Sequence, residues 1–175
     1  GGWWILQSSS NFNTYDVRGW GLPGDVPVPG DYDGDGKADP AIYRPTTGEW
    51  WLLRSSTNFG TYTQRGWGLA GDVPVPADYD GDGKTDVAIY RPSNGEWWIL
   101  WSSSNFLTYS RYGWGLPGDT PVAGDYDGDG KSDIAIFRQT TGQWWVLNSS
   151  SNFGTYTVVG WGLSSDVPVP ADYDG

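Results

Sequence analysis

One 47-residue unit recurs along the whole chain, and this repeat limits the fold more than any other feature. A Trp-Trp pair marks each copy, at Trp3-Trp4, Trp50-Trp51, Trp97-Trp98 and Trp144-Trp145. The 175 residues hold about 3.7 copies, with no insertion between them. We treat 1–175 as a single repeat domain whose units cover 1–25 (partial), 26–72, 73–119, 120–166 and 167–175 (partial).

Each unit is predicted to form four short strands. In the second full unit they cover residues 73–79, 87–91, 96–101 and 106–114. Adjacent Trp97 and Trp98 load both faces of one strand with large apolar surface, which is typical of a sheet buried on both sides. We therefore expect an all-β fold, a β-propeller built from 47-residue four-stranded antiparallel blades.

The composition supports this expectation. Aromatic residues make up 17% of the chain, and 27 Gly and 12 Pro make turns frequent. Strong helix formers are scarce, since Met is absent and Glu occurs twice. No stretch reaches the roughly 18 consecutive apolar residues of a membrane helix, so we expect no membrane insertion.

Several function classes are excluded by residues that the chain lacks. Without His or Cys there are no disulfides, zinc fingers, thiol nucleophiles or imidazole triads. The two glutamates, Glu49 and Glu96, occupy equivalent repeat positions, whereas a glycosidase needs two carboxylates in unequal surroundings. We predict that the chain is not an enzyme. A net charge of −11 argues against a nucleic-acid partner, because phosphate contacts need clustered Lys and Arg.

The acidic loop D-x-D-x-D-G-x-x-D is the sharpest chemical motif. It occurs at residues 31–39, 78–86 and 125–133, and a fourth copy begins at Asp172. Carboxylates at positions 1, 3, 5 and 9, a carbonyl at position 7 and a glycine for the turn suit Ca²⁺. The predicted ligands are Asp31, Asp33, Asp35, Lys37, Asp39, Asp78, Asp80, Asp82, Lys84, Asp86, Asp125, Asp127, Asp129, Lys131, Asp133, Asp172 and Asp174.

Two other interpretations of these loops are open. They could be Asx-type turns without a metal. An EF-hand would need a Glu at loop position 12, where Ile42, Ile89 and Ile136 stand, and a helix after the loop. Three full copies at one spacing favour Ca²⁺ over both. Because the crowded carboxylates repel one another, metal binding is expected to couple to stability.

The loop at 31–39, followed by Ala41-Ile42-Tyr43-Arg44, resembles the FG-GAP or VCBS repeat. That repeat builds Ca²⁺-binding β-propellers in integrin α heads, bacterial surface proteins and some fungal lectins. The resemblance spans all 3.7 units, and the acidic loop is its specific part. It implies one blade per repeat, with the Ca²⁺ loop between the inner strand and the next. Such propellers usually have seven blades and somewhat longer repeats.

Other recurring residues have structural and ligand-binding interpretations. The Trp-Trp pairs are expected in the core between blades. Trp20, Trp67, Trp114 and Trp161 lie beside Gly-rich turns and are candidate contacts for a ligand such as a glycan. Arg44, Arg91 and Arg138 are predicted to pair with a carboxylate or to stack on a Trp.

We expect a non-catalytic, extracellular or cell-surface module, stabilised by Ca²⁺, for adhesion or ligand binding with avidity from repetition. Alternatively, the chain is a self-associating subunit or segment of a filament or surface layer, with incomplete blades completed by neighbouring chains. Four whole units would need 188 residues. A window onto a longer repeat protein, a multi-chain assembly and a four-bladed ring with a defective blade therefore remain open.

Overall fold

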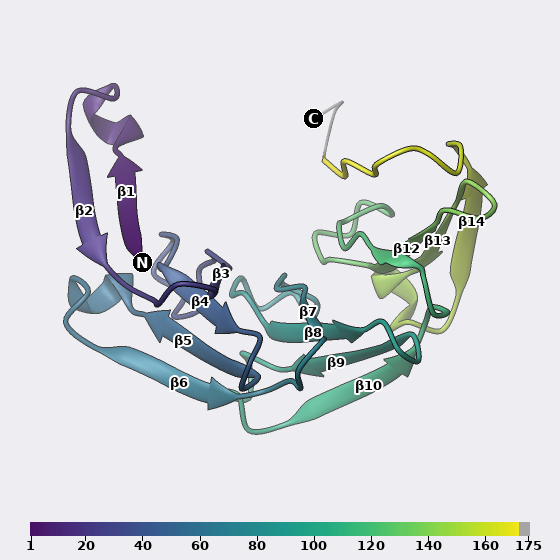
Figure 1. The fold of residues 1–175 in the computed structure, drawn as a ribbon, viewed down its shortest axis with the longest axis horizontal. Coiled ribbons are helices and arrows are strands. Elements are labelled where there is room, and N and C mark those ends of the chain that lie inside the picture. The colour runs from purple at the N-terminus through teal and green to yellow at the C-terminus, as the bar shows by residue number, and fades with distance from the viewer. Residues whose placement is uncertain (172–175) are drawn as a thin grey trace. The chain divides into compact units, whose positions relative to one another are not determined.

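The computed structural model describes residues 1–171, which belong to two compact units, Gly1–Ala70 and a second that begins at Gly71 (Figure 1). The first unit contains β1 (Gly2–Leu6), the short 3₁₀ turn η1 (Ser8–Ser10), β2 (Tyr15–Gly19), β3 (Val26–Pro27), β4 (Ala41–Arg44), β5 (Glu49–Leu53), the 3₁₀ turn η2 (Ser55–Thr57) and β6 (Tyr62–Gly66). The second contains β7 (Val73–Pro74), β8 (Val87–Arg91), β9 (Glu96–Leu100), β10 (Tyr109–Gly113), β11 (Thr120–Pro121), β12 (Ile134–Arg138), β13 (Gln143–Leu147), the 3₁₀ turn η3 (Ser149–Ser151) and β14 (Tyr156–Gly160).

Consecutive strands pair with each other throughout. Three antiparallel sheets have the orders β3-β4-β5-β6, β7-β8-β9-β10 and β11-β12-β13-β14, and β1 pairs with β2. The register repeats with the sequence, since Ile42, Ile89 and Ile136 lie opposite Trp51, Trp98 and Trp145. The prediction of an all-β chain with four-stranded antiparallel sheets is confirmed. Among the described residues, no helix has the length and apolar character needed to span a membrane.

The strand bounds agree best in the middle of a unit. β8 covers the predicted residues 87–91, and β9 ends one residue before the predicted 101. The prediction at 106–114 is wrong at its start, because Asn105 and Phe106 adopt φ of 57° and 60° and form a turn before β10. The prediction at 73–79 is too long, because β7 contains only Val73–Pro74 and prolines cannot donate to a strand ladder.

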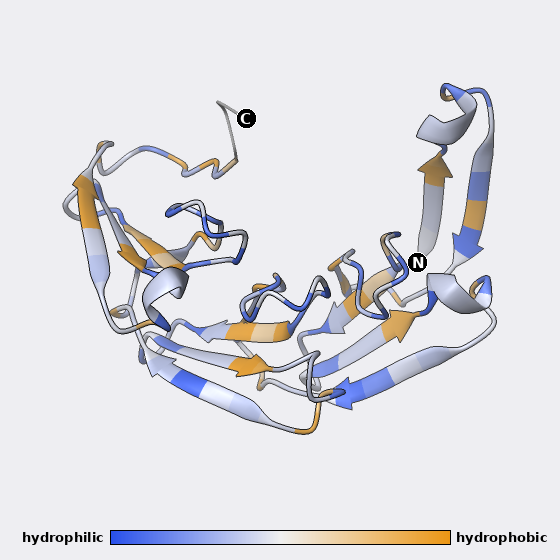
Figure 2. Cartoon of the chain, turned by 180° about the vertical axis from the view of Figure 1, so that it is seen from behind, coloured by the Kyte–Doolittle hydropathy of each residue, from blue (hydrophilic) through white to orange (hydrophobic). Residues whose placement is uncertain are grey.

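The Trp-Trp pairs place one indole on each face of their strand. Trp50 and Trp97 are 0% exposed, and each donates its Nε1–H over 2.7 Å to a carbonyl, that of Trp67 or of Trp114. The second indole is half-buried on the other face at Trp51, Trp98 and Trp145, whereas Trp4 is 75% exposed. The central strands carry hydrophobic segments, whereas the acidic loops are hydrophilic (Figure 2).

A bidentate ion pair ties the start of each full sheet to its second strand. Arg44 donates to both carboxylate oxygens of Asp25 at 2.9 Å, and its guanidinium lies 5.5 Å from the ring centre of Trp51. This hydrogen bonding lowers the pKa of Asp25. Arg91 and Arg138 pair in the same way with Asp72 and Asp119. Their guanidinium groups lie 5.5 Å from the ring centre of Trp98 and 4.9 Å from that of Trp145. The prediction that these arginines pair with a carboxylate or stack on a Trp is confirmed.

Candidate metal centre

The three complete acidic loops connect the first and second strands of the four-stranded sheets. We call residues 31–39 the first loop, 78–86 the second loop and 125–133 the third loop. Each loop is closed at its base by a β-bridge, Gly30 to Asp39, Ala77 to Asp86 and Gly124 to Asp133. The ninth loop residue is therefore fixed by the sheet, and the earlier aspartates fold back towards it.

Three aspartates in each loop bring one oxygen apiece together. The trios are Asp31, Asp33 and Asp39; Asp78, Asp80 and Asp86; Asp125, Asp127 and Asp133. Within each trio these oxygens lie no more than 4.8 Å apart. Oxygens on opposite sides of one Ca²⁺ lie up to about 5 Å apart, since each bond is about 2.3–2.6 Å long. Each trio therefore has the dimensions to contact a single cation.

The last carboxylate of each trio is fully buried, because Asp39, Asp86 and Asp133 are 0% exposed. Burial raises the pKa of Asp39. Burial also raises the pKa of Asp86 to about 7, although hydrogen bonds from Ser102 and Tyr79 favour its charged form. A buried carboxylate beside two others is stabilised in its ionised form by a bound cation.

An unsatisfied oxygen in the first loop supports this interpretation. The Oδ1 atom of Asp33 is buried and has no hydrogen-bond partner, while Oδ2 accepts a hydrogen bond from Ser56 Oγ at 2.6 Å. Buried carboxylate oxygens without partners are rare, and coordination to a cation would satisfy this one. The residues present therefore fit a hard divalent cation such as Ca²⁺.

The loop backbone also forms Asx-type turns. Asp31 accepts hydrogen bonds from the N–H groups of Gly34 at 2.6 Å and Gly36 at 2.8 Å. Asp78 and Asp125 make the equivalent bonds in the other loops. These bonds also agree with the metal-free interpretation. The buried ninth aspartate and the unsatisfied Asp33 oxygen favour a cation.

The remaining predicted ligands occupy different positions. The fifth loop residues, Asp35, Asp82 and Asp129, lie outside the trios and accept a hydrogen bond from the backbone N–H of Lys37, Lys84 and Lys131, respectively. Coordination by these aspartates and by the lysine carbonyls stays a prediction. The predicted ligands Asp172 and Asp174 lie outside the described residues.

Serines that close the site were not among the predicted site residues. Ser55, in η2, donates its N–H to Asp39 at 2.7 Å and its hydroxyl to Asp35 at 2.9 Å. The other two loops repeat these contacts through Ser102 and Ser149. The signal was available, since each of these serines lies 16 residues after a ninth loop aspartate.

A tyrosine at the second loop position anchors each loop to the first strand of its sheet. Tyr32 donates its hydroxyl to the carbonyl of Val28 at 2.8 Å, and its own N–H is donated to Asp39. Tyr79 and Tyr126 donate in the same way to Val75 and Val122. No role was predicted for these tyrosines, although they recur with the loop.

The four candidate ligand-binding tryptophans have different surroundings. Trp20 and Trp114 are half-buried and reach the next sheet of their own unit, donating Nε1–H to the carbonyls of Trp51 at 3.2 Å and Trp145 at 3.0 Å. Trp67 is half-buried. Trp161 is 79% exposed.

Comparison with protein-family models gives a match to the FG-GAP-like repeat at residues 31–89 and 78–136. The two matches together span more than half of the chain and contain all three complete acidic loops. No curated protein sequence matches the chain.

Proposed function

The chain belongs to the FG-GAP-like repeat family, and we propose that it is a non-catalytic, extracellular binding module whose repeats are stabilised by Ca²⁺. Membership suggests a repeat module of the adhesion or ligand-binding type, and this family is typically non-catalytic. The observation that carries the proposal is the aspartate trio, present three times, with its fully buried ninth residue. Millimolar extracellular Ca²⁺ would keep such loops filled.

We further propose that the four-stranded sheets are blades of a β-propeller. Support comes from the second unit, where Trp97 and Ile99 of one sheet share a core with Ile134, Ile136 and Leu147 of the next. Each acidic loop then lies between the first two strands of a blade. Ca²⁺ would join the loop to the carboxylate at its base, and Ser55 and its equivalents would hold that loop against the third strand.

The ligand surface is proposed to consist of one aromatic cluster per repeat. In the first unit, Tyr62 is 54% exposed and lies 5.6 Å from the ring of Trp20 and 5.5 Å from that of Trp51. In the second, Tyr156 is 59% exposed and lies 5.3 Å from Trp114. Exposed aromatic faces supported from below suit a glycan, and repetition would supply avidity.

Calcium binding is the first test of this proposal. Isothermal titration of the metal-free chain should show at least three sites, and Asp33→Asn should remove one. Asp16→Asn is the matched control, because Asp16 pairs with Arg18 outside the loops. No heat and no rise in melting temperature with Ca²⁺ would refute the metal site.

Ligand binding is tested separately on a glycan array in Ca²⁺. Tyr62→Ala and Tyr156→Ala should each lower the signal without changing the melting temperature. Leu107→Ala, which removes another exposed apolar side chain at 77% exposure, should leave the signal unchanged. No binding to any glycan would reject the glycan ligand while leaving the calcium result intact.

A further inference from the structure

The second unit shows how one sheet of this repeat covers the next. Sheet β7–β10 contributes Ala88, Tyr90, Trp97 and Ile99 to a core in which Ile134, Ile136 and Leu147 of sheet β11–β14 take part. All seven side chains are at most 9% exposed, and Trp145 packs against them. The contact therefore joins one face of a sheet to the opposite face of its successor.

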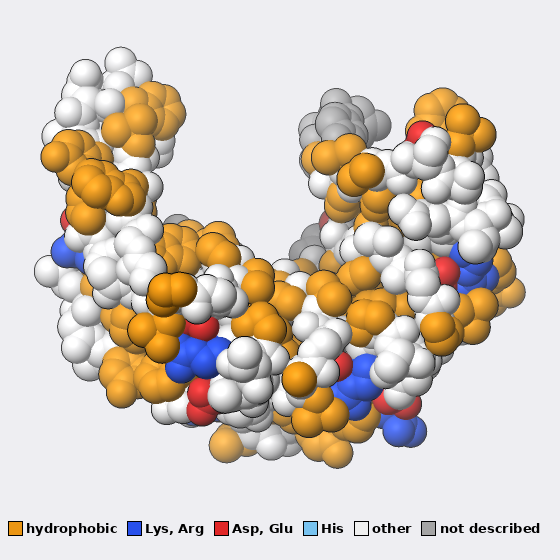
Figure 3. All heavy atoms as spheres, viewed as in Figure 1, with side chains coloured by type: hydrophobic (Ala, Val, Ile, Leu, Met, Phe, Trp, Pro, Cys, Tyr) orange, Lys and Arg blue, Asp and Glu red, His pale blue; other side chains and the backbone are white. Residues whose placement is uncertain are grey.

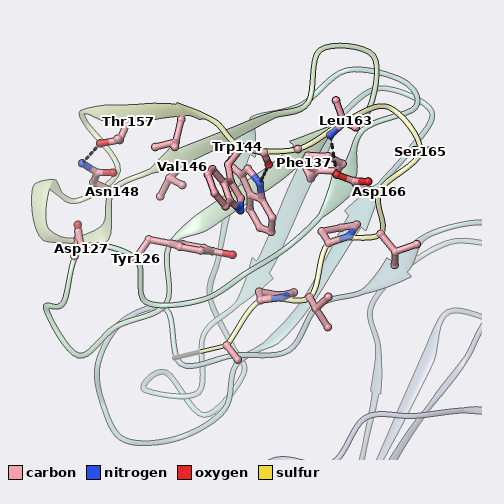
Figure 4. A pocket seen from close by; sticks show the side chains of 18 residues that line it. Tyr126, Asp127, Phe137, Trp144, Val146, Asn148, Thr157, Leu163, Ser165 and Asp166 are labelled. Carbon is pink, nitrogen blue, oxygen red and sulfur yellow. Dashed lines mark hydrogen bonds between the residues drawn. The ribbon is translucent and has the colours of Figure 1, made fainter. Parts of the chain in front are cut away.

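The corresponding face of sheet β11–β14 is only partly covered, since Phe137 and Val146 are 1% and 5% exposed but Trp144 is half-buried. Phe137, Trp144 and Val146 hold the same repeat positions as Tyr90, Trp97 and Ile99, and the neighbouring strand adds Val159, which is 49% exposed. We call Phe137, Trp144, Val146 and Val159 the open face. Together with residues 161–171 it lines a mostly apolar hollow of about 1130 Å³ (Figure 4).

The tryptophan that follows the fourth strand of a sheet contacts the next sheet. Trp114, which follows β10, lies 6.3 Å from the ring of Trp145 on the next sheet and donates a hydrogen bond to its carbonyl. Trp20, which follows β2, bonds the carbonyl of Trp51 in the same way. Trp161 holds this position after β14 but is 79% exposed and lines the hollow.

The β1–β2 hairpin carries the complementary surface. Trp4, Leu6 and Phe12 hold the repeat positions of Trp145, Leu147 and Phe153, which pack against the preceding sheet in the second unit. On the hairpin these three are 75%, 57% and 59% exposed. We call Trp4, Leu6 and Phe12 the hairpin face. Apolar side chains gather over this hairpin, at the upper left of Figure 3.

We propose that the open face of one chain binds the hairpin face of a second copy, reproducing the contact between sheets β7–β10 and β11–β14. Trp161 of one copy would then pack edge to face against the second copy's Trp4, as Trp114 does against Trp145. Two different faces make this a heterologous contact, which propagates from copy to copy into a ring or an open chain. The inference depends on neither the metal nor the ligand of the proposed function.

Net charge sets the conditions for this association. Each copy carries −11, so copies repel one another at low ionic strength. Salt screens that repulsion and strengthens apolar contact, so self-association should increase with NaCl concentration. An association held by surface ion pairs would weaken instead.

Sedimentation velocity of the 175-residue chain in Ca²⁺ tests the proposal. The mass should rise with protein concentration. Val159→Glu should weaken association about tenfold or more, because it places a carboxylate in an apolar contact. Val158→Glu is the matched control, since this neighbour lies on the opposite face of β14 and is also exposed, at 37%. Trp4→Glu should act like Val159→Glu from the other side of the contact.

Mixing the two defective variants gives the decisive result. Val159→Glu keeps a working hairpin face and Trp4→Glu keeps a working open face, so the mixture should form a 1:1 dimer and nothing larger. A wild-type chain that is monomeric at all concentrations would overturn the proposal, whether the face stays bare or is covered within one chain. Association that survives both substitutions, or a mixture that stays monomeric, would also overturn it. Circular dichroism of each variant separates these outcomes from misfolding.

Discussion

The second and third loops have the same donor atoms but different surroundings. The first two aspartates of the trio are half-buried in the second loop and exposed in the third. Tyr79 of the second loop is 1% exposed, whereas the equivalent Tyr126 is 40% exposed. The two loop sequences differ at one position only, Thr85 in the second loop and Ser132 in the third. The difference in burial between the two loops therefore arises from what packs against each loop and not from its own sequence.

The third loop itself covers the second. The N–H of Ser132 donates to the carbonyl of Asp78 at 2.7 Å. The Lys131 side chain passes so close to Gly81 that a Cβ placed there would lie 2.9 Å from its Cε. At Gly128, the third-loop equivalent, a Cβ would meet no atom within 4 Å. A repeat thus sets the burial and electrostatics of the site in the repeat before it.

Substitution of the first Trp of a pair should have a large effect on stability, and this effect should differ between sheets β7–β10 and β11–β14. Trp97→Ala should lower the free energy of unfolding by about 3–5 kcal/mol, because it empties a fully buried position between two sheets. Trp144→Ala, on the open face, should cost less than about 3 kcal/mol, because the site is only half-buried. Urea unfolding in Ca²⁺, followed by circular dichroism, measures both. Equal losses would show that the following sheet adds nothing.

Removing one metal site at a time tests whether the second and third loops differ in their contribution to stability. Asp80→Asn and Asp127→Asn should each remove one bound Ca²⁺ and its stabilisation, about 2.7 kcal/mol at a hundredfold excess over Kd. The loss should be greater for Asp80→Asn, because the second loop is more shielded from water. Calcium stoichiometry and thermal unfolding check both variants. Unchanged stoichiometry in both would contradict the assignment of these trios.

The second loop should also respond to pH. Because burial raises the pKa of Asp86 to about 7, Ca²⁺ must displace a proton below that pH, and affinity should fall about tenfold per pH unit. Without metal, the protonated form stabilises the fold. This contribution is complete below the ordinary value of 3.8 and is lost as pH rises through about 7.

The pH dependence of calcium affinity is measured on the Asp127→Asn variant, in which the second loop is unchanged. Its calcium affinity should be lower at about pH 6 than at about pH 8, while its melting temperature in EGTA should change in the opposite sense. A calcium affinity independent of pH would contradict the role of Asp86.

The smallest expected effect concerns the contact between the two loops. Gly81→Ala and Gly128→Ala share a backbone cost of roughly 1–2 kcal/mol, since φ is 81° and 78° at these positions. Gly81→Ala should cost about 0.5 kcal/mol more, because Lys131 must leave its rotamer. Lys131→Ala should abolish that difference in a double-mutant cycle. If the stability difference between Gly81→Ala and Gly128→Ala persists after Lys131→Ala, the Lys131 side chain is not its cause.

Much of one unit could be predicted from the sequence. The strand at 87–91 follows from its β-branched and aromatic residues, and the trio Asp78, Asp80 and Asp86 from the spacing of carboxylates. Strand propensity and carboxylate spacing can both be recognised within a few neighbouring residues. The strand predicted to begin at Phe106 begins at Tyr109, because a positive φ at an aromatic residue has no reliable sequence pattern.

The serine contacts were missed for a different reason. Ser102 reaches Asp86 only because β8 and β9 pair in a register that brings the end of β9 beside the loop base. Without that register, a serine 16 residues away has no visible connection with the carboxylate. Sequence separation conceals contacts that strand pairing creates.

The 47-residue unit, its β-structure and the carboxylates available to a cation could all be predicted from the sequence, because repetition, strand propensity and ligand spacing are visible in the order of residues. Which copies of these residues are buried depends on the packing of one sheet against another. Trp97 and Trp144 occupy the same place in the repeat, yet one is enclosed between two sheets and the other lines an open hollow. The burial of a residue depends on whether the next sheet covers it. The sequence of one repeat does not show this, because the contact is made by the neighbouring repeat.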